Sequence, residues 1–157
     1  MMNDILLHQD IDVYSFWPVQ SMIDMMGEDY LTYFNIARIK KNITLKAIWP
    51  PAQSVDVKRY PFMSAGKEFL RDMRVAPDDI TAKLSYMVYD NKVMVTSSRR
   101  ESYGFILQSQ DMADMMVDQF QMIWKISRPV IHETKGTESF LTLLHESGEN
   151  YMQDYEE

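Results

Sequence analysis

The spacing of hydrophobic residues changes several times along the chain, and each change predicts a different element. Residues 10–17 alternate apolar and polar side chains, which is typical of a strand. Apolar residues then recur at helical spacing from 19 to 37, although Gly27 interrupts the pattern. This region forms either one bent helix or a short helix followed by a longer one over 28–41. A second strand is predicted over 43–49, so the first unit is a crossover that joins two parallel strands.

The second half of the chain predicts antiparallel strands and one long helix. Asp90 and Asn91 separate two apolar runs, and both residue types tolerate the positive φ that a type I′ hairpin turn requires. Ser109 is a good cap for the helix that follows, and Pro129 stops that helix. The other predicted elements are a loop with some extended structure over 50–63, a short helix over 64–70, and strands over 71–76, 82–89, 92–98 and 102–109.

Length and composition restrict the class of protein. A chain of 157 residues with 46% hydrophobic residues can bury the core of one domain. No apolar run reaches the roughly 18 residues that span a bilayer, and the acidic first residues do not resemble an export signal. The chain has no Cys, which excludes disulfides and thiolate chemistry. We therefore expect a cytoplasmic protein that does not bind membranes.

The charge is unevenly distributed and predicts two segments. From residue 128 on, seven acidic and two basic residues give −5 of the total −7. We expect a domain over 1–127 and an acidic C-terminal tail over 128–157 that holds a short amphipathic helix at 137–146. The longest runs of basic residues are short pairs such as 40–41 and 99–100, whereas phosphate-backbone binding needs a concentrated basic surface. We expect no direct nucleic-acid binding.

The order of the predicted elements resembles one half of a phospholipase D-type fold, an α/β fold with a mixed sheet flanked by helices. Active members carry an H-x-K-x-x-x-x-D motif on a strand and a G-S-x-N-like stretch after the next strand. Aligned on the hairpin, Asp90 takes the position of the acid. The other positions are occupied by Lys83 (His), Ser85 (Lys), Ser97 and Ser98 (Gly-Ser) and Arg100 (Asn). Lysine cannot replace the attacking imidazole unless its pKa is strongly lowered, so we expect a degenerate, non-catalytic domain.

A second resemblance uses the same part of the chain. The hairpin 89–93 (YDNKV), the strand 104–107 (GFIL) and the helix end 120–124 (FQMIW) resemble the end of the effector domain of TrmB-type transcription regulators. Upstream, 37–50 (ARIKKNITLKAIWP) and 68–77 (EFLRDMRVAP) resemble the family's helix-to-strand joint and a following strand. The resemblance covers roughly residues 4–127. No winged helix of the kind that precedes this domain in the family comes before Ile5.

The resemblance implies a non-catalytic regulatory domain that senses a small molecule, often a sugar, or mediates dimerisation. We expect a homodimer, a sugar or anion as ligand, and a DNA-binding subunit on a separate chain, with no cofactor and no metal. The ligand is expected over Lys83, Ser85, Ser97, Ser98 and Arg100. Residues 96–102 (TSSRRES) can cradle an anion with hydroxyl groups, guanidinium groups and backbone N–H, but they are equally a normal polar connection between strands. Two alternatives stay open: an interaction module without a ligand, to which the tail helix contributes contact surface, and a residual phosphodiesterase.

The 14 Met residues suggest either copper binding or core packing. Thioethers bind Cu(I), and the segments 22–26 (MIDMM) and 112–116 (MADMM) have helical spacing. Met also fills irregular interiors well. We expect these side chains to lie on the core faces of their helices.

Overall fold

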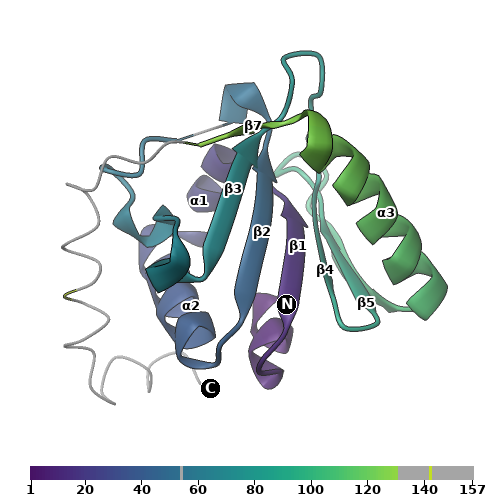
Figure 1. The fold of residues 1–157 in the computed structure, drawn as a ribbon, viewed down its shortest axis with the longest axis horizontal. Coiled ribbons are helices and arrows are strands. Elements are labelled where there is room, and N and C mark those ends of the chain that lie inside the picture. The colour runs from purple at the N-terminus through teal and green to yellow at the C-terminus, as the bar shows by residue number, and fades with distance from the viewer. Residues whose placement is uncertain (54, 131–141, 143–157) are drawn as a thin grey trace.

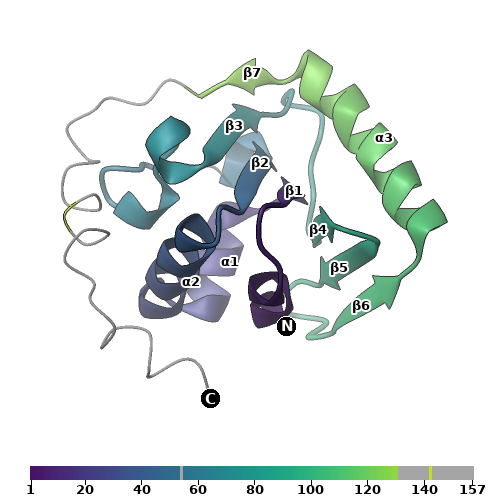
Figure 2. The same ribbon diagram turned by 60° about the horizontal axis from the view of Figure 1, so that its bottom comes forward.

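The computed structural model describes residues 1–53, 55–130 and 142, and its centre is one mixed sheet between two layers of helices (Figures 1 and 2). The sheet has seven strands in the order β6-β5-β4-β1-β2-β3-β7. Helices α1 and α2 cover one face, and α3 covers the other. The predicted fold class, α/β with a mixed sheet flanked by helices, is confirmed. No helix in the described part of the chain is both long and apolar enough to cross a membrane.

Three parallel strands form one half of the sheet: β1 (Asp12–Phe16), β2 (Thr44–Trp49) and β3 (Arg71–Val75). β1 pairs with β2, and β2 pairs with β3, so the predicted parallel crossover is confirmed. A short strand, β7 (Arg128–Pro129), pairs antiparallel with β3 at this edge. Arg128 and Pro129, which we assigned to the tail, are therefore part of the sheet.

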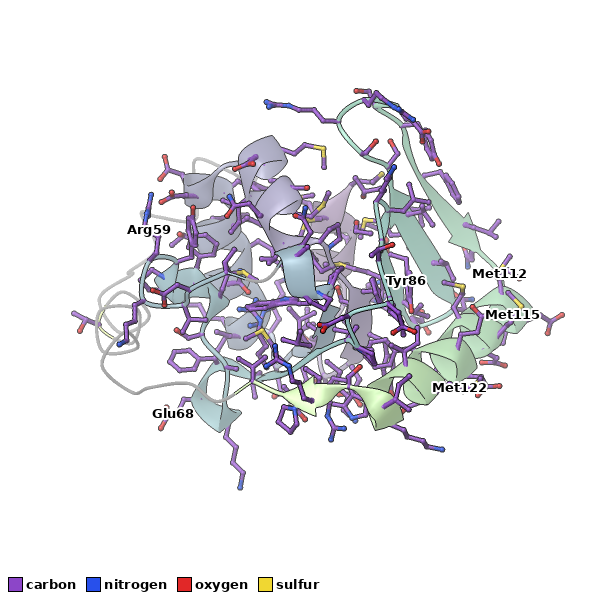
Figure 3. The ribbon with its side chains drawn as sticks, turned by 90° about the horizontal axis from the view of Figure 1, so that it is seen from above. Arg59, Glu68, Tyr86, Met112, Met115 and Met122 are labelled. Atoms are coloured by element: carbon purple, nitrogen blue, oxygen red, sulfur yellow. The ribbon has the colours of Figure 1, made fainter. Side chains whose placement is uncertain are left out.

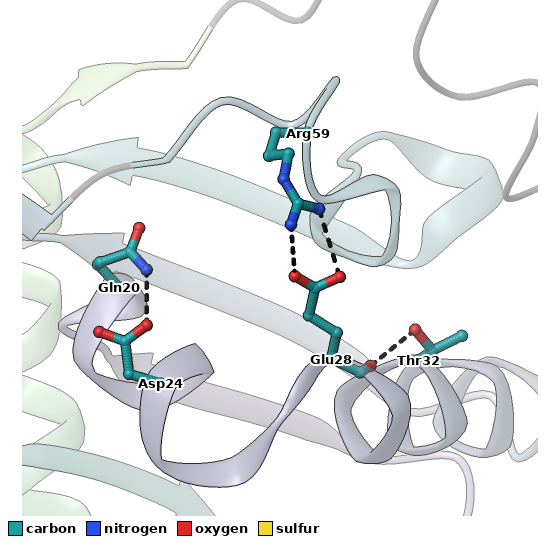
Figure 4. Close-up of polar contacts among 5 residues, drawn as sticks. All are labelled: Gln20, Asp24, Glu28, Thr32 and Arg59. Carbon is teal, nitrogen blue, oxygen red and sulfur yellow. Dashed lines mark hydrogen bonds and ion pairs between the residues drawn. The ribbon is translucent and has the colours of Figure 1, made fainter.

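The helical segment between β1 and β2 is broken in two, as one of the two alternatives predicted. α1 (Val19–Met26) and α2 (Glu28–Lys40) meet at Gly27, whose φ of 85° belongs to the region that glycine adopts most easily. The side chain of Arg59 donates to both carboxylate oxygens of Glu28 in the first turn of α2, which ties the loop after β2 to this helix (Figure 4). The segment Met2–Leu7, a 3-10 helix called η1, packs against α2.

The other half of the sheet is antiparallel: β4 (Ser85–Tyr89), β5 (Lys92–Thr96) and β6 (Gly104–Gln108). The predicted two-residue hairpin is confirmed, but its turn type is not. Asp90 has a φ of 50°, whereas Asn91 is not among the residues with positive φ, and a type I′ turn requires both.

Helix α3 (Gln110–Ile126) follows β6 and lies against β1, β4 and β5. The hydroxyl of Ser109 accepts from the N–H of Met112 at 3.3 Å, which confirms the predicted cap. The buried side chains of Ala113 and Phe120 face the sheet. The helix ends before Pro129, as predicted.

The loop predicted over 50–63 is confirmed, the short helix predicted over 64–70 is reduced to one turn, and one local prediction falls outside the described residues. Residues 50–63 contain two 3-10 turns, Pro51–Gln53 and Pro61–Met63, and their described part forms no strand. The helix expected over 64–70 is a single 3-10 turn, Lys67–Phe69, because Gly66 (φ 121°) and Leu70 (φ 46°) have non-helical backbone on either side. The amphipathic helix expected at 137–146 lies, except for Thr142, outside the described residues.

Candidate functional site

The hairpin register brings the predicted ligand residues to one end of β4 and β5. Ser85 is the cross-strand partner of Thr96, so Lys83 lies close to the segment that follows β5. Lys83, Ser98 and Arg100 line the same open pocket, together with Leu84 and Glu101, and the pocket volume is about 380 Å³. Three of the five predicted residues are therefore brought together.

The other two predicted residues, Ser85 and Ser97, are buried and are not among the residues that line this pocket. Ser85 lies on the α1–α2 side of the sheet, beside Met2 and Trp17. The hydroxyl of Ser97 accepts from the N–H of Tyr103 at 2.7 Å and donates to the carbonyl of Ser98 at 3.2 Å. Ser97 thus closes the loop between β5 and β6, which is a structural role.

The pocket is open to solvent, and the charged side chains that line it make few and weak contacts. The side chain of Arg100 is 84% exposed, and its described ion pair, with the neighbouring Glu101, is long at 3.9 Å. Asp90 lies at the opposite end of the hairpin, five residues from Ser85, which is about 16 Å along a strand. The acid of the phospholipase D alignment therefore cannot meet Ser97 and Ser98. The arrangement offers cationic groups to a solvated anion.

A second candidate surface lies on the α3 side of the sheet, where β6 stands beside the helix. Phe105 and Leu107 are the cross-strand partners of Val95 and Val93, and Val93 packs beneath α3 with Ala113. Cross-strand partners share one face of a sheet, so Phe105 and Leu107 point to the α3 side. Tyr103 stacks on Phe105 with ring centroids 6.5 Å apart. These aromatic and aliphatic side chains are exposed, with Phe105 at 49%.

Helix α3 adds an apolar stripe next to this strand. Met112, Met115, Met122 and Ile126 recur at spacings of three, seven and four, which places them on one side of a helix, with the polar Gln119 between them. Met112 packs against the same cluster as Val95, whereas Met115, Met122 and Ile126 are exposed to solvent. Met112, Met115 and Met122 follow one another along α3, starting near the end of β6 (Figure 3). We call this surface the β6–α3 face; its exposed apolar members are Tyr103, Phe105, Leu107, Met115, Met122 and Ile126.

The expectation that the Met residues of 112–116 lie on a core face is confirmed for Met112 and Met116, which pack against the cluster of Val88, Val93 and Ala113, but not for Met115. Met115 is exposed, and further along the helix Met122 is 68% exposed. The buried face of α3 is instead carried by Ala113 and Phe120. The signal was present in the sequence: positions 115, 122 and 126 are apolar but lie outside the arc that contains 113, 117, 120 and 124.

Among the described residues, strand β6 also leaves part of its backbone without a partner strand, because it is the last strand of the sheet. Ser97 and Asn91 bond to Tyr103 and Ser109, and hydrogen-bonded pairs alternate along an antiparallel ladder. Phe105 and Leu107 therefore bond to β5. The N–H and C=O groups that point outward belong to Gly104, Ile106 and Gln108. The strand contains neither proline nor a charged residue, the two usual protections of an edge.

Beneath α3, an aromatic cluster keeps the helix in place. Tyr14 contacts Phe120 edge-to-face at 5.3 Å, and Phe120 stacks on Trp124 at 5.6 Å. Tyr86, labelled in Figure 3, stacks on Phe16 on the same side of the sheet. Burial raises the pKa of Tyr86 to about 12, so its hydroxyl stays protonated at neutral pH. These aromatic contacts hold α3, and with it the helical part of the β6–α3 face, against the sheet.

The comparisons with known proteins identify the fold. No family model and no curated protein matches the sequence. Among solved structures, the chain is similar to TrmBL2, an archaeal chromatin protein whose structure shows a novel mode of DNA binding. The TM-score is 0.61 at 13% sequence identity, and the match covers 82% of this chain and 48% of TrmBL2. The chain therefore shares its fold with a part of TrmBL2 and spans about half the length of that protein.

Proposed function

We propose that this chain is a non-catalytic regulatory domain of a TrmB-like transcription regulator, and that it pairs with a second copy of itself through the β6–α3 face. The observation that carries the proposal is the combination of an unprotected edge strand with exposed apolar side chains on the same side of the sheet. Edge strands of this kind are templates for pairing with another chain. The fold shared with a part of TrmBL2 and the motifs of 89–124 support the regulator class.

The sequence of β6 fits an antiparallel pair with its own copy. If the two strands meet across a two-fold axis at Ile106, Gly104 of one copy lies opposite Gln108 of the other, and their outward backbone groups bond. Phe105 then faces Leu107 of the second copy in a non-hydrogen-bonded pair, where side chains approach most closely. Both aromatic–aliphatic pairs lie on the α3 side.

The charges of α3 fit the same arrangement. A two-fold axis perpendicular to the sheet places the two copies of α3 on one side, running in opposite directions. The first half of the helix carries Asp111, Asp114 and Asp118, whereas Lys125 lies in its last turn. The acidic half of each helix is then directed toward the basic end of the other. This complementarity favours a second copy over an unrelated apolar partner.

The test uses two variants whose charges complement each other across the pair. Phe105→Lys and Leu107→Glu each bury an unpaired charge against an apolar partner, so each chain alone is expected to sediment as a monomer. In an equimolar mixture, the introduced lysine of one chain faces the introduced glutamate of the other, and a heterodimer is expected to form. The readouts are sedimentation velocity and native mass spectrometry.

Leu7→Lys is the matched control for the charge variants. Leu7 is 78% exposed and lies in η1, which packs on the α1–α2 side of the sheet, so this variant should dimerise like the wild type. A monomeric wild type at high micromolar concentration, or variants that dimerise as well as the wild type, would overturn the proposal.

A second candidate function is the sensing of a small anionic ligand at the pocket of Lys83, Ser98 and Arg100. Two cations and a hydroxyl group beside a volume of about 380 Å³ suit a sugar phosphate or a simple anion. Thermal-shift measurements with these compounds, with and without Arg100→Ala, test this function. A shift that persists in Arg100→Ala would place the ligand elsewhere.

The DNA contact of such a regulator is assigned to a separate DNA-binding subunit. TrmBL2 binds DNA according to its description, whereas this chain carries a net charge of −7 and only short basic pairs. Phosphate backbones repel such a surface. An electrophoretic mobility assay with the isolated chain should therefore show no shift, and a shift at physiological salt would contradict this assignment.

A further inference from the structure

The interior on the α1–α2 side contains two arginines that share one neutral partner. Nε of Arg38 donates to Oδ1 of Asn35 at 2.8 Å, and Nη2 of Arg71 donates to the same oxygen. The other described bonds of the two guanidinium groups go mainly to main-chain carbonyls, among them those of Leu70 and Phe62. Both side chains are buried, and no carboxylate in the described part of the chain forms an ion pair with either.

A small cavity lies next to Arg71, over the centre of the sheet. Ser15 of β1 is the register partner of Ala47 of β2, and these two small residues leave room between the sheet and α2. Trp17 and Trp49 line the cavity where these parallel strands end, and Asn35 and Arg71 contribute its polar side. About 20 Å³ is open to the centre of a water-sized particle. One water needs roughly 10–15 Å³ by this measure, so the space suits one small particle.

Three residues that line this cavity have buried polar atoms without a hydrogen-bond partner in the protein. They are Oγ of Ser15, Nε1 of Trp17 and Nε1 of Trp49. The indole nitrogens only donate, and a hydroxyl group donates when its partner is an acceptor. Each such buried group left without a partner costs about 1–3 kcal/mol. These three donors and the guanidinium group of Arg71 thus belong to residues that line a space of one-particle size.

We propose that this cavity is a binding site for one small monovalent anion of the halide class, held by Arg71, by the indole N–H groups of Trp17 and Trp49, and by the hydroxyl of Ser15. The inference is independent of the proposed dimerisation, since the cavity lies on the opposite side of the sheet from the β6–α3 face.

Charge and size select this class of ligand. A water molecule accepts hydrogen bonds from the same donors but leaves both guanidinium charges without compensation in a medium of low polarity. Phosphate, sulfate and carboxylate groups have several heavy atoms and exceed the volume. A halide ion accepts bonds from all directions and supplies one negative charge.

The titration behaviour of the two arginines agrees with this assignment. Burial lowers the pKa of Arg71 to about 9. Burial, followed by the charge of Arg71, lowers the pKa of Arg38 as well. A neighbouring anion acts against both effects, because it favours the charged form of each guanidinium.

The first experiment measures thermal unfolding of the full chain in sodium gluconate, with chloride or bromide replacing gluconate at constant ionic strength. An anion that binds only the folded state raises the melting temperature with saturation, by about 5–10 °C at a hundred times Kd. Gluconate is too large for the cavity and provides the baseline. Equal melting temperatures in gluconate and chloride, or a rise without saturation, would overturn the proposal.

Two matched Trp→Phe variants locate the effect. Trp49→Phe removes one N–H donor from the cavity and keeps an aromatic ring, so at least half of the chloride-dependent shift should be lost. Trp124→Phe makes the same change on the α3 side of the sheet and should retain the full shift. If both variants keep the shift, the anion binds elsewhere and the assignment is wrong.

Crystals of the wild type grown in sodium bromide give a result that does not depend on whether a variant folds. An anomalous difference peak between Arg71 and Trp49 is expected. Peaks confined to the surface would mean adventitious ions only and would overturn the proposal.

Discussion

Two helices and η1 cover one face of the sheet, whereas a single helix covers the other. A helix with its side chains is about 10 Å wide and strands are about 4.8 Å apart, so α3 cannot cover the four strands from β6 to β1. It lies over β1, β4 and β5 and leaves β6 beside it. The α1–α2 face is closed so completely that it encloses two arginines, while the α3 face ends in exposed Phe105 and Met122. The difference teaches that one sheet can serve stability on one face and assembly on the other.

The largest expected loss of stability comes from a substitution on the α1–α2 side of the sheet. Asn35→Ala removes the oxygen that accepts from both Arg38 and Arg71 and leaves two buried donors of cationic groups without this partner. The free energy of unfolding should fall by about 3–5 kcal/mol in urea denaturation. Asn35→Asp keeps an acceptor and adds a negative charge between the guanidinium groups. Its free energy of unfolding should therefore fall clearly less than that of Asn35→Ala. Equal losses in both variants would show that cavity formation, not charge, sets the cost.

A pair of substitutions within α3 compares its buried and exposed sides. Phe120→Ala empties a fully buried position and should lower the free energy of unfolding by about 3 kcal/mol. Met122→Ala, two positions along, should change the stability of the monomer by less than about 0.5 kcal/mol but should weaken dimerisation. Guanidinium denaturation at low protein concentration separates the two quantities. A large loss of monomer stability in Met122→Ala would mean that this side of α3 belongs to the core.

The predicted ligand residues give an intermediate effect. Ser97→Ala removes the acceptor of the Tyr103 N–H inside the loop and should cost about 1–2 kcal/mol in the same assay. Arg100→Ala changes an exposed side chain and should leave the unfolding midpoint unchanged within error. If the two variants lose the same stability, the assignment of a structural role to Ser97 but not to Arg100 is wrong.

The smallest expected effect depends on pH. The carboxylate of Asp4 accepts from Lys92 and Tyr89, each at 2.9 Å. Burial alone would raise the pKa of Asp4, but the bonds from Lys92 and Tyr89 outweigh it, so the pKa lies below its usual value. The stabilisation is therefore complete above the unfolded-state pKa, near 4, and is lost as the pH falls through the folded-state pKa.

Asp4→Asn should accordingly reduce the free energy of unfolding at pH 7 by about 0.5–1 kcal/mol. The difference from the wild type should shrink below pH 4. Urea denaturation at pH 7, 4 and 2.5 measures it, and a difference that stays constant over this range would contradict the role of the charge.

Most of the fold could be predicted from local sequence patterns. The strands β1 and β2 alternate or run as apolar blocks, Gly27 breaks the helical segment, and Ser109 caps α3; each depends on a few neighbouring residues. The turn at Lys67–Phe69 was missed because its boundary includes Leu70 at φ 46°. The carbonyl of Leu70 accepts from Leu45 N–H and from Arg38, which are distant in sequence. Such tertiary support leaves no local signal.

The candidate sites were harder to predict for the same reason. Ser85 and Ser97 have the composition of a ligand site, but the direction of each side chain depends on which face of the sheet receives a helix. Likewise, the local pattern of 36–40 (IARIK) does not indicate that Arg38 points inward, where the carbonyls of Ile43 and Leu70 accept from its guanidinium group. The exposed apolar side of α3 could be predicted from the sequence. Positions 115, 122 and 126 are apolar but lie outside the arc of 113, 117, 120 and 124 that forms the buried face.

The two edges of the sheet differ in their capacity for growth. β7 is two residues long and one of them is Pro129, which has no N–H to donate. A head-to-tail contact of β6 on β7 would generate an open filament, and this edge offers too few donors for it. Among the described strands, the proposed dimer uses the contact of β6 with its own copy, and this contact pairs the free edges of both copies at once. In that dimer, the proline at the far edge disfavours the addition of further chains.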